Sequence, residues 1–317
     1  MPRSTIVITS FALSAFAALP AFANATNQAR VSINPSFSGG GGPIDLIDQH
    51  TGACDESGAT TGGASSSGHG TAHTEYGFIR LTGDAAGSIG TQSSGHFQDG
   101  IVITKVGVPM NTAGTLTFTV RVDGSLSSGA GASASTWQLR ADVGDGVFDI
   151  GKDGRFNGPG IFPSGYQGDP FGTYSATVSF LYGQPLQLHV QFSGTAGAGY
   201  DSNGAGSAAF GSPLTCTWLG ISNVLVNGQP AGTVTIASES GTNWGSDLTP
   251  VTCDSIDFNG DGLFPDTQDI DDFLSVFSGG PCSTGTCGDI DFNNDGLFPD
   301  TSDIDSLLSV FSGGACV

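Results

Sequence analysis

The chain has 317 residues, a formal net charge of −21, 51 glycines and only 12% charged residues. Nucleic-acid phosphates and anionic lipids repel a chain this acidic, so we exclude both as partners. The length suits one large domain with a small appendage, or two domains.

The first 23 residues have the pattern of a secretory signal peptide. A positive start precedes the apolar residues 6–19, and Ala21-Phe22-Ala23 forms an A-x-A cleavage site. A transmembrane span is a weaker interpretation, because the apolar run is short and broken by Pro20. We therefore predict cleavage before Asn24, with Ala25 as the next candidate, and a secreted or cell-surface protein without membrane insertion.

Residues 24–250, called the body below, contain segments with the composition and alternation typical of strands. They are residues 76–81, 100–105, 114–122, 136–142, 174–181, 186–192, 216–226 and 232–238. Residues 182–185 predict a hairpin turn, and the Gly/Ser/Ala-rich residues 36–74 and 194–213 predict long loops. The fold class that we predict for the body is mainly β, a jelly-roll-like β-sandwich.

Histidines of the body offer one candidate metal site. His69 and His73 are four residues apart, and His50 and His96 are near them in sequence, so zinc binding is one interpretation. This spacing joins two imidazoles only on a helix, whereas here it falls in a predicted loop. Exposed loop histidines are therefore the simpler interpretation.

Four aspartates of the body could bind calcium, although turn-forming Asp-Gly steps explain them more simply. They are Asp142, Asp145, Asp149 and Asp153. Trp137, Trp218 and Trp244 could stack on sugar rings, but tryptophan on a strand is more often part of the core. The sequence has no Gly-x-Ser-x-Gly, His-Glu-x-x-His or phosphate-binding glycine loop. We therefore expect a non-catalytic body.

Residues 251–317, called the tail below, contain one motif twice, at residues 253–282 and 287–316. In the first copy, Asp257, Asn259 and Asp261 alternate along the chain before Gly262. Oxygen ligands in this order, followed by a glycine at a sharp turn, open the calcium loop of an EF-hand. The Leu263 carbonyl would be the next ligand. The second copy repeats these ligands as Asp291, Asn293, Asp295 and Leu297.

Each loop precedes a short segment with one apolar face, which predicts a helix. The apolar positions are Ile270, Phe273, Leu274 and Phe277, repeated as Ile304, Leu307, Leu308 and Phe311. A Gly-Gly pair ends each segment. Because neither helix is long enough to be stable alone, we expect them to pack through these faces.

The later ligands depart from the usual EF-hand order. The usual closing carboxylate is replaced by Gln268 in the first copy and by Ser302 in the second. We expect neighbouring carboxylates to complete each loop, with Asp266 and Asp269 in the first copy and Asp300 and Asp303 in the second. The tail holds thirteen of the chain's 29 acidic residues and no Lys or Arg. Cations would neutralise it, so calcium is preferred to a calcium-free hairpin held by disulfides.

The tail resembles the dockerin type I domain, in the GC-type variant whose repeats end in Gly-Gly-x-Cys, here at Cys282 and Cys316. The resemblance covers about the last fifth of the chain. It implies two Ca²⁺ ions, one per repeat, and docking onto a cohesin-like or cell-envelope partner. It also implies that Asp266-Thr267 and Asp300-Thr301 recognise this partner, and that either copy could do so because the two pairs are identical.

Six cysteines on an exported chain predict three disulfides. We expect Cys54 to pair with Cys216 in the body. Two symmetric pairings are open to the tail: Cys253–Cys282 with Cys287–Cys316, or Cys253–Cys316 with Cys282–Cys287. We prefer the first, because a unit that duplicates tends to carry its own crosslink.

The end of the body resembles a group of exported bacterial proteins that carry C-terminal sorting tags and have no assigned activity. The matching segments are residues 179–192, 208–210, 219–228 and 234–244. This resemblance implies an exported β-sandwich and no reaction.

We therefore predict an exported, non-catalytic β-sandwich tethered through a calcium-binding, dockerin-like tail. An alternative is a module that binds or degrades polysaccharide and is recruited to a complex by the tail. An exposed row of aromatic residues, or two carboxylates in a groove, would favour that alternative. A third hypothesis is that the tail only stabilises the body.

Overall fold

The computed structural model describes residues 25–34, 43–62, 66–129, 133–144, 146–157, 165–167, 169–198, 206–250, 253–263, 266–294, 301–312 and 316. The predicted signal peptide therefore lies outside the described residues. The chain divides into two compact units, Met1–Leu248 and Thr249–Val317. The names body and tail are kept for these units, which meet two residues before the predicted boundary.

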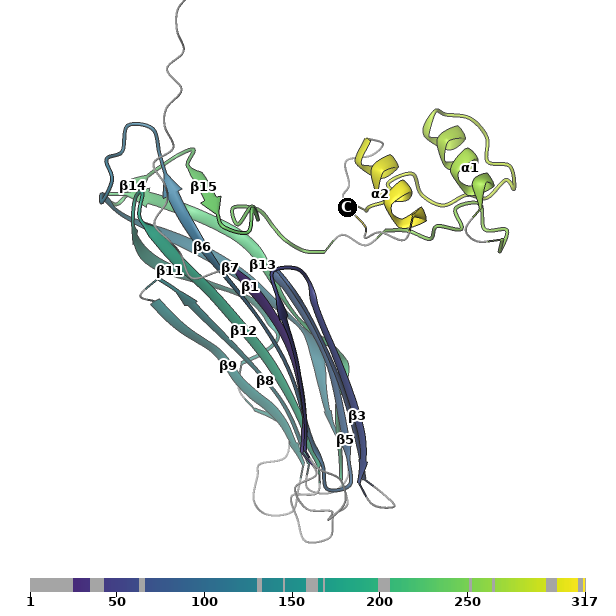
Figure 1. Cartoon of the computed structure of the whole chain (residues 1–317), viewed down its shortest axis with the longest axis horizontal. Coiled ribbons are helices and arrows are strands. Elements are labelled where there is room, and N and C mark those ends of the chain that lie inside the picture. Colours follow the sequence, from purple (N-terminus) through teal and green to yellow (C-terminus); the bar gives the residue numbers. More distant parts are fainter. Residues whose placement is uncertain are drawn as a thin grey trace, which may run out of the picture. The chain divides into compact units, whose positions relative to one another are not determined.

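The body consists of two antiparallel sheets (Figure 1). The first sheet contains β1 (Thr26–Asn34), β2 (Ile44–His50), β6 (Gly90–Thr104), β8 (Ser133–Val143), β9 (Gly146–Asn157), β10 (Gly165–Gln167), β12 (Pro185–Ala198) and β15 (Thr235–Ser238). The second sheet contains β3 (Cys54–Gly62), β4 (Ser66–Glu75), β5 (Phe78–Ala86), β7 (Ala113–Ser128), β11 (Gly172–Leu181), β13 (Ser207–Val226) and β14 (Gln229–Pro230).

The central strands of the two sheets follow the order of a jelly roll. The first sheet runs β10-β9-β8-β12-β6-β1-β2 with β15 beside β6, and the second runs β11-β7-β13-β5-β4-β3 with β14 beside β13. From β5 to β9 and from β11 to β13, the chain changes sheet at every step except between β8 and β9. The predicted hairpin turn at residues 182–185 was therefore wrong, since β11 and β12 lie in different sheets and do not pair. The pair β1–β2 extends the first sheet, and the pair β3–β4 extends the second. The predicted mainly β sandwich is therefore observed.

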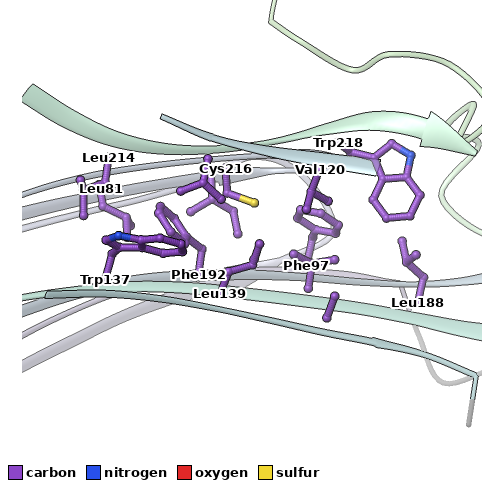
Figure 2. Packing of buried hydrophobic residues seen from close by; sticks show 14 of the residues in the cluster. Leu81, Phe97, Val120, Trp137, Leu139, Leu188, Phe192, Leu214, Cys216 and Trp218 are labelled. Carbon is purple, nitrogen blue, oxygen red and sulfur yellow. The ribbon is translucent and has the colours of Figure 1, made fainter. Parts of the chain in front are cut away.

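The core lies between the two sheets, because inward and outward side chains alternate along the strands. Side chains of the first sheet, such as Trp137 and Phe192, meet Leu81 and Leu214 of the second sheet (Figure 2). Trp137, Trp218 and Trp244 are at most 1% exposed. The three tryptophans are core residues, so they form no platform for sugar rings.

The expectation of long loops at residues 36–74 and 194–213 was wrong for much of both stretches. Strands β2, β3 and β4 lie in the first stretch, and β12 and β13 extend into the second. A Cβ added at Gly68 would lie 2.7 Å from Ile89, and one added at Gly194 would lie 2.4 Å from Phe210. These glycines therefore serve close packing inside the sandwich, although their composition is typical of loops.

The predicted Cys54–Cys216 disulfide was also wrong, since both residues are buried free cysteines. Cys54 lies on β3 and Cys216 on β13, with β4 and β5 between them in the same sheet. Three strand spacings of about 4.8 Å each exceed the roughly 7 Å between Cα atoms that a disulfide can span. Burial raises the pKa of Cys216 to about 12, so its thiol stays protonated.

The tail contains two helices of equal length, α1 (Thr267–Phe277) and α2 (Thr301–Phe311). They pack around a small core of Phe258, Phe273, Phe292 and Leu307. The predicted apolar faces were wrong at one position in each copy, since Leu274 is 43% and Leu308 46% exposed. The core contains the residue just before each exposed leucine, Phe273 in α1 and Leu307 in α2. Because successive helical residues point about 100° apart, the leucine that follows is directed away from this core.

The tail disulfides are Cys253–Cys316 and Cys282–Cys287. The preferred pairing within each repeat was therefore wrong, and the nested alternative is observed. The Asp254 N–H donates to the Phe292 carbonyl, and the Gly288 N–H donates to the Phe258 carbonyl, both at 2.8 Å. The start of each repeat thus lies against the loop of the other repeat, so each first cysteine bonds the last cysteine of the other copy.

Candidate calcium-binding loops of the tail

The first loop turns its predicted ligands toward its own backbone. The Gly262 N–H donates to Asp257 Oδ2 at 3.1 Å, and the Asp261 N–H donates to Asn259 Oδ1 at 3.0 Å. The Leu263 N–H donates to Asp261 Oδ1 at 2.8 Å. Gly262 has φ +78°, a left-handed conformation that favours glycine. The loop therefore gathers side-chain oxygens from alternating positions around a sharp turn.

One oxygen of this loop has no partner. Among the described tail residues, Asp257 Oδ1 is the buried side-chain oxygen or nitrogen without a hydrogen bond. A buried carboxylate oxygen without a donor is costly unless a cation neutralises it. Carboxylate and amide oxygens are the donors that calcium prefers, so these residues fit calcium.

The later predicted ligands of the first copy form the start of α1. Asp266 is the N-cap residue, and its side chain accepts the Gln268 N–H at 2.8 Å. Asp269 is fully buried and accepts the N–H groups of Asn259 at 3.3 Å and Asp266 at 3.1 Å. Asp269 thereby joins the loop to the helix.

The second copy repeats the same junction. The Asn293 N–H donates to Asp303 Oδ1 at 3.4 Å, and Asp303 is fully buried. The Asn294 N–H donates to the Asp291 carbonyl at 3.1 Å. The remaining predicted ligands of this copy lie outside the described residues; they are Asp295, Leu297 and Asp300.

A further acidic residue, Asp272 on α1, was not among the predicted site residues. It is 3% exposed and accepts hydrogen bonds from Asn259, Gln268 and Ser283. The Ser283 hydroxyl contributes most to lowering the pKa of Asp272 to about 2, which keeps the carboxylate ionised. The signal available in the sequence was the difference between the copies, because Ser306 occupies the equivalent position.

Each helix exposes the same four residue types along one stripe. Thr, Asp, Leu and Ser recur at spacings that bring them to one side of a helix. They are Thr267, Asp271, Leu274 and Ser278 on and after α1, and Thr301, Asp305, Leu308 and Ser312 on and after α2. We call these the two stripes. The predicted recognition residues Thr267 and Thr301 are the first member of each.

The four histidines of the zinc interpretation lie in different surroundings. His69 and His73 lie on β4 and face separate acids, Asp84 at 3.6 Å and Asp55 at 2.8 Å. His96 on β6 contacts the ring of His189 on β12, with centroids 5.2 Å apart. The proposed grouping was therefore wrong.

His50 instead lies near Asp48 and Cys54, with possible ligand atoms within 4.8 Å of one another. The Gly52 N–H donates to His50 Nδ1 at 3.0 Å, and His50 Nε2 lies 3.3 Å from Asp48. A neutral ring in this arrangement carries its proton on Nε2, so neither nitrogen offers a free lone pair. These contacts do not fit a metal site.

Of the four body aspartates considered for calcium binding, only one has a described side chain. Asp142 Oδ2 accepts a hydrogen bond from Arg140 Nε at 3.1 Å and lies 3.5 Å from His189 Nδ1. The side chains of its three companions, Asp145, Asp149 and Asp153, lie outside the described residues.

A cavity of about 730 Å³ in the body is lined by uncharged residues, including Phe180, Leu181 and Leu225. It therefore presents no carboxylate pair of the kind that a glycosidase uses.

The chain was compared with known proteins at three levels. No protein-family model and no curated protein matches it. Among solved structures, it has 10% identity to the adhesin domain of Epf from Streptococcus pyogenes, with a TM-score of 0.21. The alignment covers 72% of this chain and 61% of that one, so this chain spans about three fifths of that structure. No helix in the described part of the chain is long and apolar enough to cross a membrane.

Proposed function

We propose that this protein is an exported, non-catalytic β-sandwich that is tethered to an extracellular or cell-surface partner through its tail. Calcium held by the two loops orders the tail, and the helices then present the docking surface. The tail is accordingly a dockerin-like domain, and its partner is a cohesin-like or cell-envelope protein. The observation that carries this proposal is the duplicated acidic loop, whose buried carboxylates have no Lys or Arg within the tail.

Charge supports the calcium part of the proposal. Asp269 and Asp303 are fully buried at equivalent positions, and Asp257 contributes an unpartnered oxygen. Buried carboxylates are tolerated where cations or several hydrogen-bond donors face them. Two calcium ions would add four positive charges to a tail with thirteen acids, and so reduce the repulsion that opposes its compact state.

The two stripes support the docking part. An exposed leucine beside an exposed aspartate offers a partner an apolar contact next to a charged one. Leu274 and Leu308 are exposed to nearly the same extent, 43% and 46%. Because the stripes have the same residue types in the same order, one partner surface can bind either copy. A surface complementary to these stripes carries a leucine-sized pocket beside basic residues.

Export completes the proposal. The signal-peptide pattern of residues 1–23 supports secretion, and millimolar calcium outside the cell would keep the loops filled. The two tail disulfides also suit an oxidising compartment.

The test is a capture experiment in which the full chain is immobilised. It is incubated with envelope and culture fractions of the producing organism in the presence of calcium, and is then washed with a chelator. We expect one protein to be retained with calcium and released by chelator. Leu274→Ser combined with Leu308→Ser should abolish capture, whereas either substitution alone should retain it. Val106→Ser is the control, since Val106 is an exposed apolar residue of the body and lies outside both stripes and both loops. Capture that is independent of calcium, or unaffected by the double substitution, would overturn the proposal.

A further inference from the structure

The two repeats differ at two buried helical positions, of which Phe273 and Leu307 are both apolar and only the other pair differs in charge. Asp272 on α1 is 3% exposed, and its equivalent on α2, Ser306, is fully buried. Among its neighbours, Asn259 answers to Asn293 and Asp269 to Asp303, whereas its donors Gln268 and Ser283 are replaced by Ser302 and Val317. The carboxylate therefore distinguishes the first copy from the second.

Asp272 determines how the amide of Asn259 is oriented. Asn259 Nδ2 donates to Asp272 Oδ2 at 3.1 Å, which directs the opposite end of the amide, Oδ1, toward the loop. There Oδ1 accepts the Asp261 N–H at 3.0 Å. Calcium binds the oxygen of an amide and is repelled by its NH₂ group. The contact with Asp272 thus presents the ligating atom of Asn259 to the loop.

The loop closed by the Cys282–Cys287 disulfide fixes Asp272 in turn. Ser283 donates to Asp272 through its N–H at 2.8 Å and through its hydroxyl at 2.6 Å. The Thr284 hydroxyl donates to the Asn259 carbonyl at 2.7 Å. Residues 282–287 therefore hold both members of the pair, Asp272 at its carboxylate and Asn259 at its backbone carbonyl.

We propose that Asp272 is a positioning residue that makes the first loop the tighter of two unequal calcium sites. The inference rests on the proposed calcium binding of the tail. Asp272 acts in two ways. It orients Asn259, and it places a negative charge behind this ligand, near the ion without binding it. The neutral hydroxyl of Ser306 supplies no such charge. The first loop therefore fills at a lower calcium concentration than the second.

The test follows each loop separately in the full chain by calcium titration monitored with amide NMR. Gly262 reports the first loop and Gly296, its counterpart in the sequence, reports the second. In the unsubstituted chain, we expect Gly262 to reach half-saturation at the lower calcium concentration. Asp272→Ser should weaken binding at Gly262 by about 10–100-fold, the usual effect of losing an outer-layer partner of a ligand. Gly296 should shift far less.

Two further variants separate positioning from charge and from folding. Asp271→Ser removes the same charge from the adjacent exposed position, and we expect it to change the Gly262 titration only slightly. Asp272→Asn keeps the shape of the side chain, and should weaken the first site without loss of amide dispersion. If Gly262 and Gly296 titrate together, or if Asp271→Ser weakens the first site as much as Asp272→Ser, the inference is wrong. If neither glycine responds to millimolar calcium, the proposed calcium binding itself fails.

Discussion

Gly95 on β6 illustrates at the level of one residue how closely the two sheets approach. An added Cβ would lie 2.1 Å from Thr74 Oγ1 and 2.6 Å from Ile79 Cγ2, both on the opposite sheet. Such distances cannot be relieved by a small rotation, because Thr74 and Ile79 are themselves buried. Glycine at this position therefore allows the facing strands to pack.

We predict that Gly95→Ala lowers the free energy of unfolding of the body by about 1–3 kcal/mol, the usual cost of overpacking. Urea unfolding followed by tryptophan fluorescence measures this, since all three tryptophans are buried in the body. Gly90→Ala is the control on the same strand, because no heavy atom lies within 4 Å of its added Cβ. An equal effect of both substitutions would contradict the packing explanation.

At the level of the secondary-structure elements, the two tail disulfides close loops of very different length. Cys253 and Cys316 are 63 residues apart, whereas Cys282 and Cys287 are five residues apart. In the chain-entropy model, a crosslink stabilises more when it closes a longer loop. The long-range disulfide should therefore contribute more to the stability of the tail.

We predict that replacing Cys253 and Cys316 by serine lowers the free energy of unfolding of the tail by about 4 kcal/mol, against about 2 kcal/mol for Cys282 and Cys287. Hydrogen exchange of the α1 and α2 amides in the full chain measures the difference. Because the short disulfide also supports Asp272, the comparison is made without calcium. A larger loss on removing the short disulfide would contradict the entropic explanation.

Alternating strands such as β7 and β12 could be predicted from sequence, because one residue in two is apolar and faces the core. Strand β4 could not, since its inward positions are Ser66, Gly68, Gly70, Ala72 and Thr74. Strands made of small residues lack apolar alternation, and only the facing sheet shows why they are small. The same limit applies to Cys54 and Cys216, whose separation depends on strand order.

The candidate calcium site could likewise be predicted from the sequence only in part. The spacing of Asp257, Asn259 and Asp261 predicts a loop, and the structure places their side-chain oxygens around one turn. The motif spacing did not indicate Asp272, because the second copy has a serine there and its contact with Ser283, eleven residues later, depends on the fold. The nested disulfides likewise follow from the packing of the two repeats and not from the spacing within either one.

For the molecule as a whole, the distribution of charge matters more than its total. The chain carries −21 overall, and the 69-residue tail unit holds thirteen acids without a Lys or Arg. The body can pair part of its charge, as Arg30 does with Asp45 and Arg121 with Asp123. The tail has no Lys or Arg to form such pairs within itself, so hydrogen bonds stabilise its acids, and the proposed calcium ions would neutralise them further.

The most direct test of this account is isothermal titration of the full chain with calcium. We predict uptake of two ions per chain, reduced to one by Asp257→Ala and abolished by Asp257→Ala combined with Asp291→Ala. Each substitution removes the first predicted ligand of one loop, and Asp257 also supplies the unpartnered oxygen. Absence of uptake at millimolar calcium, or uptake that survives the double substitution, would contradict calcium binding by the tail loops.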